Sequence, residues 1–290
     1  MSKELTRRSA VSLGAALVTS SVVGCSEDET AGTGGGGGGT TSGPGSTGTE
    51  GTTTGNGTSG STTSNTASST GTGSVGGWAS GGTAAMVDKE TYPDPFTDPL
   101  GNACALTPAQ TLGPCYAETI DREDISEGNP GLPVRLAFLV VDTDCNPIPN
   151  ASVDVWHTDI GGLYSGEDAI DMCTLNDPEA EAGRWYRGIQ TAGADGKVYF
   201  DTCFPGWYGG RAIHIHYSVR VGDQEYLTSQ LYFPQSLIDE IFATHPDYVD
   251  YGSPDTPNAS DGIYVPGAEL DWAQMTDGAM LASKVLVVTG

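Results

Sequence analysis

Two histidines separated by one residue, His214 and His216, are the clearest candidates for chemistry in this chain. They stand in an apolar alternation, and because strand side chains repeat every two residues, both imidazoles should point to one face. Tyr208 and Arg211 precede them in a Gly-rich turn. Two imidazoles beside a phenol and a guanidinium can form half of a metal site with an anion-stabilising group. Taken alone, a His-x-His motif more often marks a polar strand face or two hydrogen-bonded histidines.

The segments around the histidines have the pattern of strands. Short apolar or alternating runs, separated by turn residues, recur with little helical periodicity. They cover residues 134–141, 151–157, 197–200, 213–219, 225–233 and 285–288. Helix is expected at 236–244, with 270–276 as a further candidate, and 245–267 reads as a long irregular loop. These features predict an all-β fold, an antiparallel β-sandwich with few short helices and long loops.

Several motifs frame the two histidines in order along the chain. They are TPAQTLGPCY at 107–116, PIPNASVDVWHTD at 147–159, GGLYSG at 161–166, YRGIQT at 186–191, PGWYGGRAIHIH at 205–216 and QLYFP at 230–234. As a set, they resemble the intradiol ring-cleavage dioxygenases, the group of protocatechuate 3,4-dioxygenase and catechol 1,2-dioxygenase. The resemblance covers residues 104–234 and is strongest to exported, single-domain members.

The resemblance implies a mononuclear non-haem Fe(III) and a catalytic set. The implied metal ligands are Tyr164, Tyr208, His214 and His216. Arg211 would stabilise developing negative charge, Gln230 would line the substrate pocket, and Tyr208 would also take part in catalysis. Phenolate oxygens are hard donors that favour Fe(III), and imidazole also suits iron. The implied reaction cleaves a catecholic ring between its two hydroxylated carbons with O2, giving a muconate-type diacid.

Other residues near these motifs are expected to be structural. His157 lies beside Trp156, a core residue, and the ligand set is complete without it. His245 reads as a solvated loop residue. Cys115 stands where the family usually has a bulky aromatic, so it changes the pocket or forms a disulfide. The chain shows no helical region like that through which the catechol enzymes dimerise, and the oligomeric state stays open.

The N-terminus reads as an export signal followed by a tether. An Arg7-Arg8 pair, a short apolar run and small residues before Cys25 resemble a bacterial lipobox, with the arginines resembling a twin-arginine signal. Residues 26–86 are dominated by Gly, Ser and Thr, which predicts a disordered linker. The predicted organisation is therefore a signal at 1–25, this linker, and a dioxygenase-like domain at 87–290. The protein is expected outside the cytoplasm, lipid-anchored through Cys25 to the cell envelope or extracellular.

Charge and cysteine usage limit the partners. The net charge is −25 with only 12 Lys and Arg residues, which argues against nucleic acid because phosphate binding needs basic clusters. The cysteines after Cys25 show no CxxC spacing, so no zinc ribbon is expected. In an exported protein they indicate one or two disulfides and a leftover thiol, with the pairing open. These cysteines are Cys104, Cys115, Cys145, Cys173 and Cys203.

Two other classes of function stay open at this level, with a structural envelope lipoprotein as a third, weaker alternative. An envelope-tethered sandwich can keep the metal site and bind aromatics without turnover, although the intact set of candidate residues weighs against this. A copper or zinc enzyme is the second alternative. A tyrosinate-bound ferric ion absorbs visible light, whereas zinc is colourless. Which catechol serves as substrate is also open, because selectivity lies in loops that the sequence does not place.

Overall fold

The computed structural model describes residues 77–289. The predicted signal with its lipobox at Cys25, and residues 26–76 of the predicted linker, lie outside the described residues. The last ten residues assigned to the linker are packed on the domain: the Ala79 N–H donates to the Gly278 carbonyl (2.8 Å), and the Trp78 and Trp272 rings lie 5.6 Å apart. The packed region therefore includes residues from 77 onward, ten before the predicted boundary, because large apolar side chains resume at Trp78.

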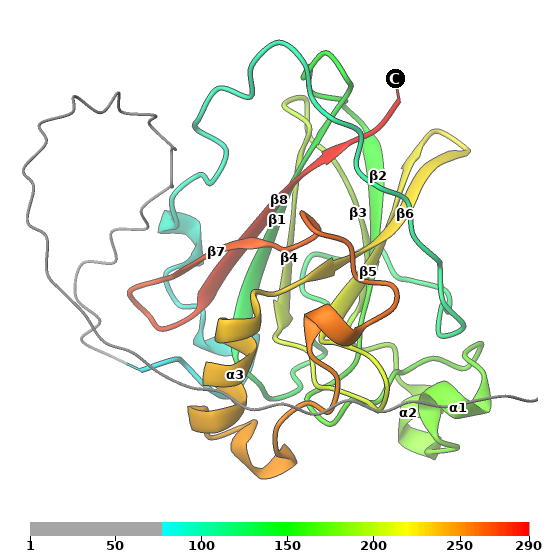
Figure 1. The fold of residues 1–290 in the computed structure, drawn as a ribbon, viewed down its shortest axis with the longest axis vertical. Helices are drawn as coiled ribbons and strands as arrows, with labels where there is room; N and C mark the ends of the chain where they lie inside the picture. Colours follow the sequence, from blue (N-terminus) through cyan, green and yellow to red (C-terminus); the bar gives the residue numbers. More distant parts are fainter. Residues whose placement is uncertain (1–76, 290) are drawn as a thin grey trace, which may run out of the picture. The chain divides into compact units, whose positions relative to one another are not determined.

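Two four-stranded sheets face each other and form the predicted β-sandwich (Figure 1). One sheet has the strand order β4-β1-β8-β7 and the other β3-β2-β5-β6. The strands are β1 (Pro133–Val141), β2 (Ala151–Trp156), β3 (Arg187–Thr191), β4 (Lys197–Cys203), β5 (His214–Val221), β6 (Gln224–Tyr232), β7 (Asp271–Gln274) and β8 (Met280–Val287). The α-helices are α1 (Asp171–Thr174), α2 (Pro178–Ala182) and α3 (Gln235–Thr244), and the 3-10 helices are η1 (Thr83–Ala85), η2 (Lys89–Thr91), η3 (Val249–Tyr251) and η4 (Asn258–Ser260).

The pairing is antiparallel in every strand pair of the two sheets except one. The C-terminal strand β8 runs parallel to β1, from Val134 opposite Met280 to Val141 opposite Val287. It lies between β1 and β7, so the last strand in sequence order has an interior position in the sheet. A chain that returns to pair with a strand far back in the sequence can arrive in either direction, which a local pattern does not specify.

The helix candidate at 270–276 is wrong, because this segment forms strand β7. It pairs with β8 through a tight turn in which the Gly278 N–H donates to the Met275 carbonyl (2.9 Å). Gly278 has a φ of +84°, a conformation that glycine adopts without a steric penalty. The turn therefore creates a hairpin, and the ladder hydrogen bonds outweigh a short helical pattern. The helix predicted at 236–244 is confirmed as α3.

The core lies between the sheets and continues under α3. Alternate residues of β1 point inward, and Phe138 stacks on Tyr217 of the facing sheet with ring centroids 6.0 Å apart. The other face of β1 is also covered, because Leu139 and Val141 pack against Phe96. Fully burying such a side chain stabilises a fold by roughly 1.5–3 kcal/mol. The continuous apolar run at 134–141 thus reflects a strand buried on both faces.

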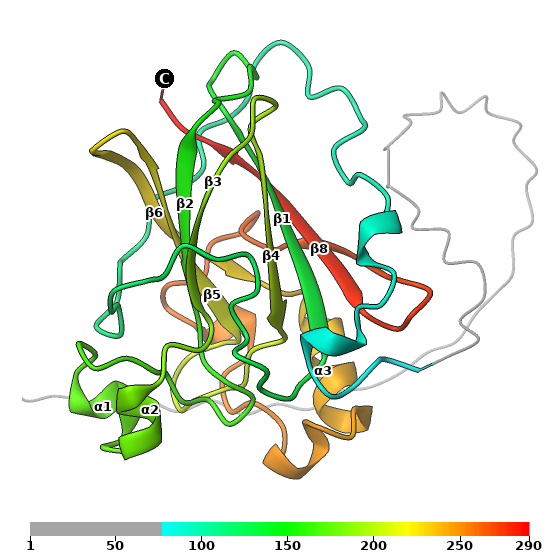
Figure 2. The same ribbon diagram turned by 180° about the vertical axis from the view of Figure 1, so that it is seen from behind.

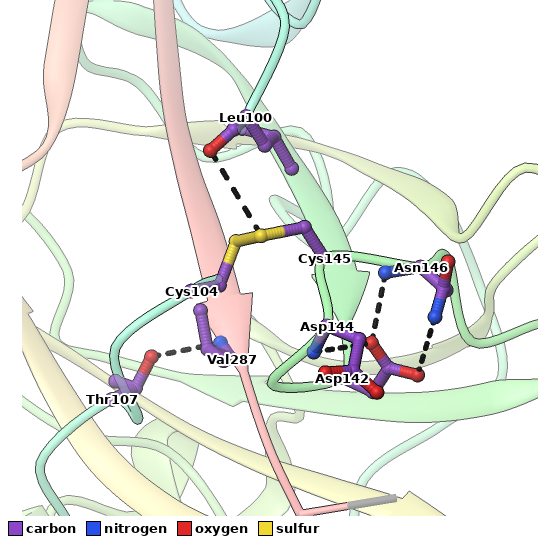
Figure 3. The surroundings of a disulfide bond; sticks show 8 residues. All are labelled: Leu100, Cys104, Thr107, Asp142, Asp144, Cys145, Asn146 and Val287. Carbon is purple, nitrogen blue, oxygen red and sulfur yellow. Dashed lines mark hydrogen bonds between the residues drawn. A yellow bond between two sulfur atoms is a disulfide. The ribbon is translucent and has the colours of Figure 1, made fainter. Parts of the chain in front are cut away.

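One disulfide joins the segment before the first strand to the β1–β2 turn (Figure 3). Cys104 bonds to Cys145, and the Asp142 side chain folds the turn by accepting hydrogen bonds from two backbone N–H groups (2.9 and 2.8 Å). A second disulfide links Cys115 to Cys173, and Cys203 is a buried free thiol. The expectation of one or two disulfides with a leftover thiol is confirmed for the described residues.

The three α-helices gather at one end of the sandwich, which both views show (Figures 1 and 2). The helices α1 and α2 belong to the long connection between β2 and β3, and α3 follows β6 directly. No helix among residues 77–289 is long and apolar enough to cross a membrane. This end of the sandwich also receives the turn that leads into β5, so it is where the candidate residues meet.

Candidate metal centre

The two histidines lie on strand β5, which is paired on both sides. His214 stands opposite Tyr232 of β6, and His216 stands between Trp156 of β2 and Gln230 of β6. Opposed residues share a face of the sheet, and the two Nε2 atoms are 3.1 Å apart, so the predicted common face is confirmed. Trp156 is core, as expected, and its ring stacks on the His216 imidazole at 5.0 Å and 10°. The strand and this stacked ring together fix the histidine orientation.

The two tyrosines come from two loops that are pressed together. In the first loop, Asp159 Oδ1 accepts hydrogen bonds from two backbone N–H groups (2.9 and 2.8 Å) and closes a turn before Tyr164. Gly162 in that turn has a φ of +82°, and a Cβ there would lie 1.9 Å from the Trp207 carbonyl oxygen. Only glycine allows this approach. The Tyr164 and Tyr208 rings therefore lie 5.8 Å apart, at the end of the histidine-bearing strand.

Four donor atoms converge at one point inside the domain. His214 Nε2 lies 3.3 Å from Tyr164 Oη, 3.2 Å from Tyr208 Oη and 3.1 Å from His216 Nε2. Tyr164 and both histidines are no more than 3% exposed, whereas Tyr208 is only half-buried. The four residues that the resemblance gave as metal ligands are thus brought together, with Tyr208 on the solvent side.

The hydrogen bonding of His214 fits a metal ion at this point. Its Nδ1 lies 2.7 Å from the Ala212 carbonyl, which accepts a hydrogen bond from the Nδ1–H, so the neutral ring has one lone pair on Nε2. One lone pair does not satisfy three neighbours, whereas metal–ligand distances of roughly 2 Å put neighbouring donors about 3 Å apart. Two imidazoles and two phenols therefore form a donor set that suits a ferric ion.

Burial controls the protonation of all four side chains. It lowers the pKa of His214 to about 3 and that of His216 well below its ordinary value, so both imidazoles stay neutral, the form that binds metals. Burial raises the pKa of Tyr164 well above its ordinary value and also raises the pKa of Tyr208, an effect that Arg211 opposes. A bound cation would invert this preference by favouring the phenolate, so the charge of a metal ion would be needed to ionise the tyrosines.

Arg211 and Gln230 lie beside the four donors. The Arg211 Nη2 donates to the Gln230 Oε1, and the Gln230 Nε2 donates to the Thr111 carbonyl (3.2 Å). Two residues further on, a Cβ on Gly113 would lie 3.0 Å from the Cε1 of His216. The segment from Thr111 to Gly113 therefore forms a wall against the histidines, and Gln230 connects that wall to the guanidinium.

Arg187 and the Cys173 carbonyl group support the Tyr164 loop, and neither contact was predicted from the sequence. Arg187 is fully buried and donates from Nε to the Ser165 carbonyl and from Nη2 to the Cys115 carbonyl (both 2.7 Å). Its guanidinium lies 5.9 Å from the Tyr164 ring centroid, and the Tyr164 N–H donates to the Cys173 carbonyl (3.1 Å). The YRGIQT motif contains Arg187, but these carbonyl groups are 22 and 72 residues away, so no local pattern identified them.

The remaining two histidines lie outside this centre. His157 is buried, with Nδ1 2.7 Å from the Thr158 carbonyl and Nε2 2.7 Å from Thr202 Oγ1, which confirms its structural role. The expectation that His245 is solvated is wrong: it is 1% exposed, and its Nε2 lies 2.8 Å from the Ala79 carbonyl. The segment from 77, assigned to the linker, covers it. Residues 77–289 contain no group of three or more His, Cys, Asp or Glu able to hold a metal.

Comparison with protein families supports the same region of the chain. A family model described as "Dioxygenase" matches residues 111–250, which include all four donors, Arg211 and Gln230. The chain is similar to a catechol 1,2-dioxygenase of Acinetobacter baylyi (27% identity; 57% of this chain and 60% of the relative). It is also similar to an intradiol ring-cleavage dioxygenase of Aspergillus niger (26% identity; 56% of this chain and 51% of the relative). The matches span between half and three-fifths of these curated relatives.

Solved structures of similar architecture agree with the sequence matches. An intradiol ring-cleavage dioxygenase from Tetranychus urticae superposes with a TM-score of 0.56 and 29% identity. The superposition covers 64% of this chain and 95% of the mite protein. This chain therefore shares its fold with nearly the whole of that solved chain.

Proposed function

Because the chain belongs to the intradiol ring-cleavage dioxygenase family, we propose that it opens a catecholic ring between the two hydroxylated carbons with O2. The proposed metal ligands are Tyr164, Tyr208, His214 and His216, and the proposed cofactor is a mononuclear non-haem Fe(III). The observation that carries the proposal is the convergence of these four donor atoms within 3.3 Å of His214 Nε2. The reaction is a balanced addition: catechol and O2 combine to give cis,cis-muconic acid, which keeps every atom of both reactants.

The ferric ion would act as a Lewis acid that binds the substrate oxygens and promotes attack by O2. Tyr208 is the ligand placed to move, because it is half-buried on a Gly-rich turn, whereas Tyr164 is buried. Its phenolate oxygen would take a proton from a substrate hydroxyl as the substrate binds. The Ala212 carbonyl fixes His214 through Nδ1, and Trp156 fixes His216, so the imidazoles stay in place.

Arg211 and Gln230 would act on the substrate rather than on the metal. The guanidinium carries a fixed positive charge beside the four donors and would stabilise negative charge that develops on the ring during opening. Gln230 is fully buried and holds Arg211 through its Oε1, so it would orient the guanidinium and line the pocket. Both residues are therefore proposed as catalytic, together with Tyr208.

We further propose that the protein is exported and anchored through a lipid on Cys25, with residues 26–76 as a tether. Two disulfides in the described domain support an oxidising compartment. Metabolic labelling with a radioactive fatty acid tests the anchor, and Cys25→Ser should release an unlabelled protein into the medium. Label that persists in the variant would contradict lipidation at this position.

The proposed reaction is tested by incubating the iron-loaded full chain with catechol under isotopically heavy oxygen gas and measuring the mass of the product. A ring-opened diacid carrying two heavy oxygen atoms is expected, and none from His216→Gln. Hydroxyquinol and protocatechuate, tested in parallel, identify the preferred ring. If the iron content is confirmed and no substrate is opened, the reaction is excluded, and the tethered aromatic-binding module becomes the better description.

A further inference from the structure

The segment 252–267 folds over the turn that carries Arg211. Asp261, at the end of η4, is buried and accepts hydrogen bonds on Oδ2 from the Arg211 Nε and from the Ala212 N–H (both 2.9 Å). Its Oδ1 accepts from the Ile263 N–H (2.8 Å). Although burial raises the pKa of Asp261, these N–H groups and the guanidinium hold it below its ordinary range. The carboxylate is thus ionised and accepts hydrogen bonds from three N–H groups.

The guanidinium of Arg211 is also held through a second nitrogen. Its Nη2 donates to the Gln230 Oε1 and lies 3.4 Å from Tyr232 Oη, which itself donates to the Gln230 Oε1 (3.2 Å). Arginine donors have a rigid planar arrangement, so fixing both Nε and Nη2 determines the orientation of the whole group. Asp261 fixes the first of these two nitrogens.

Asp261 is held in place by the rest of its segment. Asn258, at the start of η4, donates from Nδ2 to the Phe233 carbonyl (2.8 Å), and its N–H donates to the Gln235 Oε1 (2.9 Å). These contacts tie the segment to the end of β6 and the start of α3. Gln230 lies on the same strand β6, so both partners of Arg211 depend on one rigid element.

We propose that Asp261 is a positioning residue that orients Arg211 for ring cleavage; this inference rests on the proposed function. The family-model match ends at residue 250, before Asp261. A preorganised charge near the reacting atoms contributes on the order of 10²–10³ in rate only if its position is fixed before the reaction. Without the carboxylate, the guanidinium keeps its charge but loses the partner of its Nε.

The test is Asp261→Asn in the iron-loaded full chain, with catechol as substrate. Asparagine keeps the size of the side chain but has one oxygen, so it does not accept from the Arg211 side and from Ile263 at once. We expect kcat to fall at least about 10-fold while KM and the anaerobic Kd for 4-nitrocatechol change less than about 3-fold, because the charge acts on the reaction rather than on binding. The matched control is Asp255→Asn, which removes a carboxylate charge from the same segment, keeps an acceptor for the Gly210 N–H (3.2 Å) and leaves Arg211 untouched.

A double-mutant cycle separates positioning from general damage. In an Arg211→Ala background, Asp261→Asn should lower kcat by less than about 2-fold, because the residue through which it acts is already absent. Asp261→Glu keeps the charge and should recover part of kcat. An equal loss in both backgrounds, an unchanged kcat in Asp261→Asn, or an equal loss in Asp255→Asn would overturn the positioning role. A wild-type chain that binds iron and opens none of catechol, hydroxyquinol and protocatechuate would overturn the proposed function itself.

Discussion

The two halves of the candidate metal centre are held in different ways. The histidines lie on β5, a strand paired on both sides, and their orientation follows from the strand period and the stacked Trp156 ring. The tyrosines lie on two loops with no regular hydrogen-bond ladder. Their positions depend on the contact of Gly162 with the Trp207 backbone and on the disulfide beside Tyr164. The strand half of the centre, which carries the histidines, therefore meets the loop half, which carries the tyrosines, at one point.

This difference indicates how the centre can be damaged. Removing a ligand from the strand half should leave the fold largely intact and eliminate the metal. Loosening the loop half should leave the ligands present but poorly placed, with a lower affinity for the metal. Metal affinity should therefore fall with damage to either half, whereas the unfolding free energy should fall only with damage to the loop half.

The largest effect is expected from a strand ligand. His216→Gln should lower the affinity for iron at least about 100-fold, because loss of groups that only orient metal ligands already costs roughly 10–100-fold. Metal analysis after dialysis, with circular dichroism to verify the fold, gives the measurement. His157→Gln is the control, since His157 is equally buried but lies outside the centre, and it should retain iron. Retention of iron by His216→Gln would remove His216 from the ligand set.

The next effect is expected from the disulfide in the loop half. Replacing Cys115 and Cys173 by serine should lower the unfolding free energy by about 4 kcal/mol and the iron affinity about 10-fold. Replacing Cys104 and Cys145 should cost a similar free energy, because the sequence separations are comparable at 58 and 41 residues, and should leave iron affinity unchanged. Denaturant unfolding and iron titration are the measurements. Equal iron affinities in the two double variants would show that this disulfide does not support the centre.

A smaller effect is expected where the two loops touch. Gly162→Ala places a Cβ against the Trp207 carbonyl and also strains a positive φ, so the unfolding free energy should fall by about 3 kcal/mol. Gly222→Ala has the same backbone strain at φ +59° with open space around the Cβ, and should cost only about 1–2 kcal/mol. The difference in unfolding free energy between the two variants measures the effect of the close contact between the two loops. If the two variants are equally stable, the contact does not contribute.

The smallest effect is a pH dependence carried by His157. Burial lowers its pKa to about 3 in the folded state, against an ordinary value of about 6.5 in the unfolded chain. The unfolded state therefore binds more protons below pH 6.5, and the stability that the neutral ring contributes is lost as the pH falls toward 3. In metal-free protein, His157→Gln should reduce the slope of unfolding free energy between pH 6 and pH 4 by about 1.4 kcal/mol per unit. Parallel slopes for both proteins would contradict a neutral buried His157.

The strand half of the centre, with the strands around it, is the part of the structure that the sequence predicts well. Alternation places His214 and His216 on one face and locates five of the eight strands within a few residues, because ladder geometry gives a local period of two. The local pattern does not reveal that β8 runs parallel to β1, nor that 270–276 forms a hairpin strand. Both depend on partners that are distant in the chain or on a turn.

The tyrosines of the loop half could be predicted only from the family resemblance. The motifs named Tyr164 and Tyr208, but their convergence on His214 depends on a glycine contact between loops about 45 residues apart in sequence. Asp261 carried no signal, because an aspartate in a long irregular loop has the same pattern as any solvated turn residue. Its role depends on the folding of 252–267 over Arg211, which no periodicity encodes.

Four side chains are proposed to hold a ferric ion, and the visible spectrum of the protein tests this ligand set. The iron-loaded full chain should show a broad band from charge transfer between tyrosinate and Fe(III), which shifts to longer wavelength when catechol is added without oxygen. Tyr164→Phe and Tyr208→Phe should each weaken or displace the band. A colourless protein with one bound iron per chain, or a band unaffected by both tyrosine variants, would contradict the proposed ligand set.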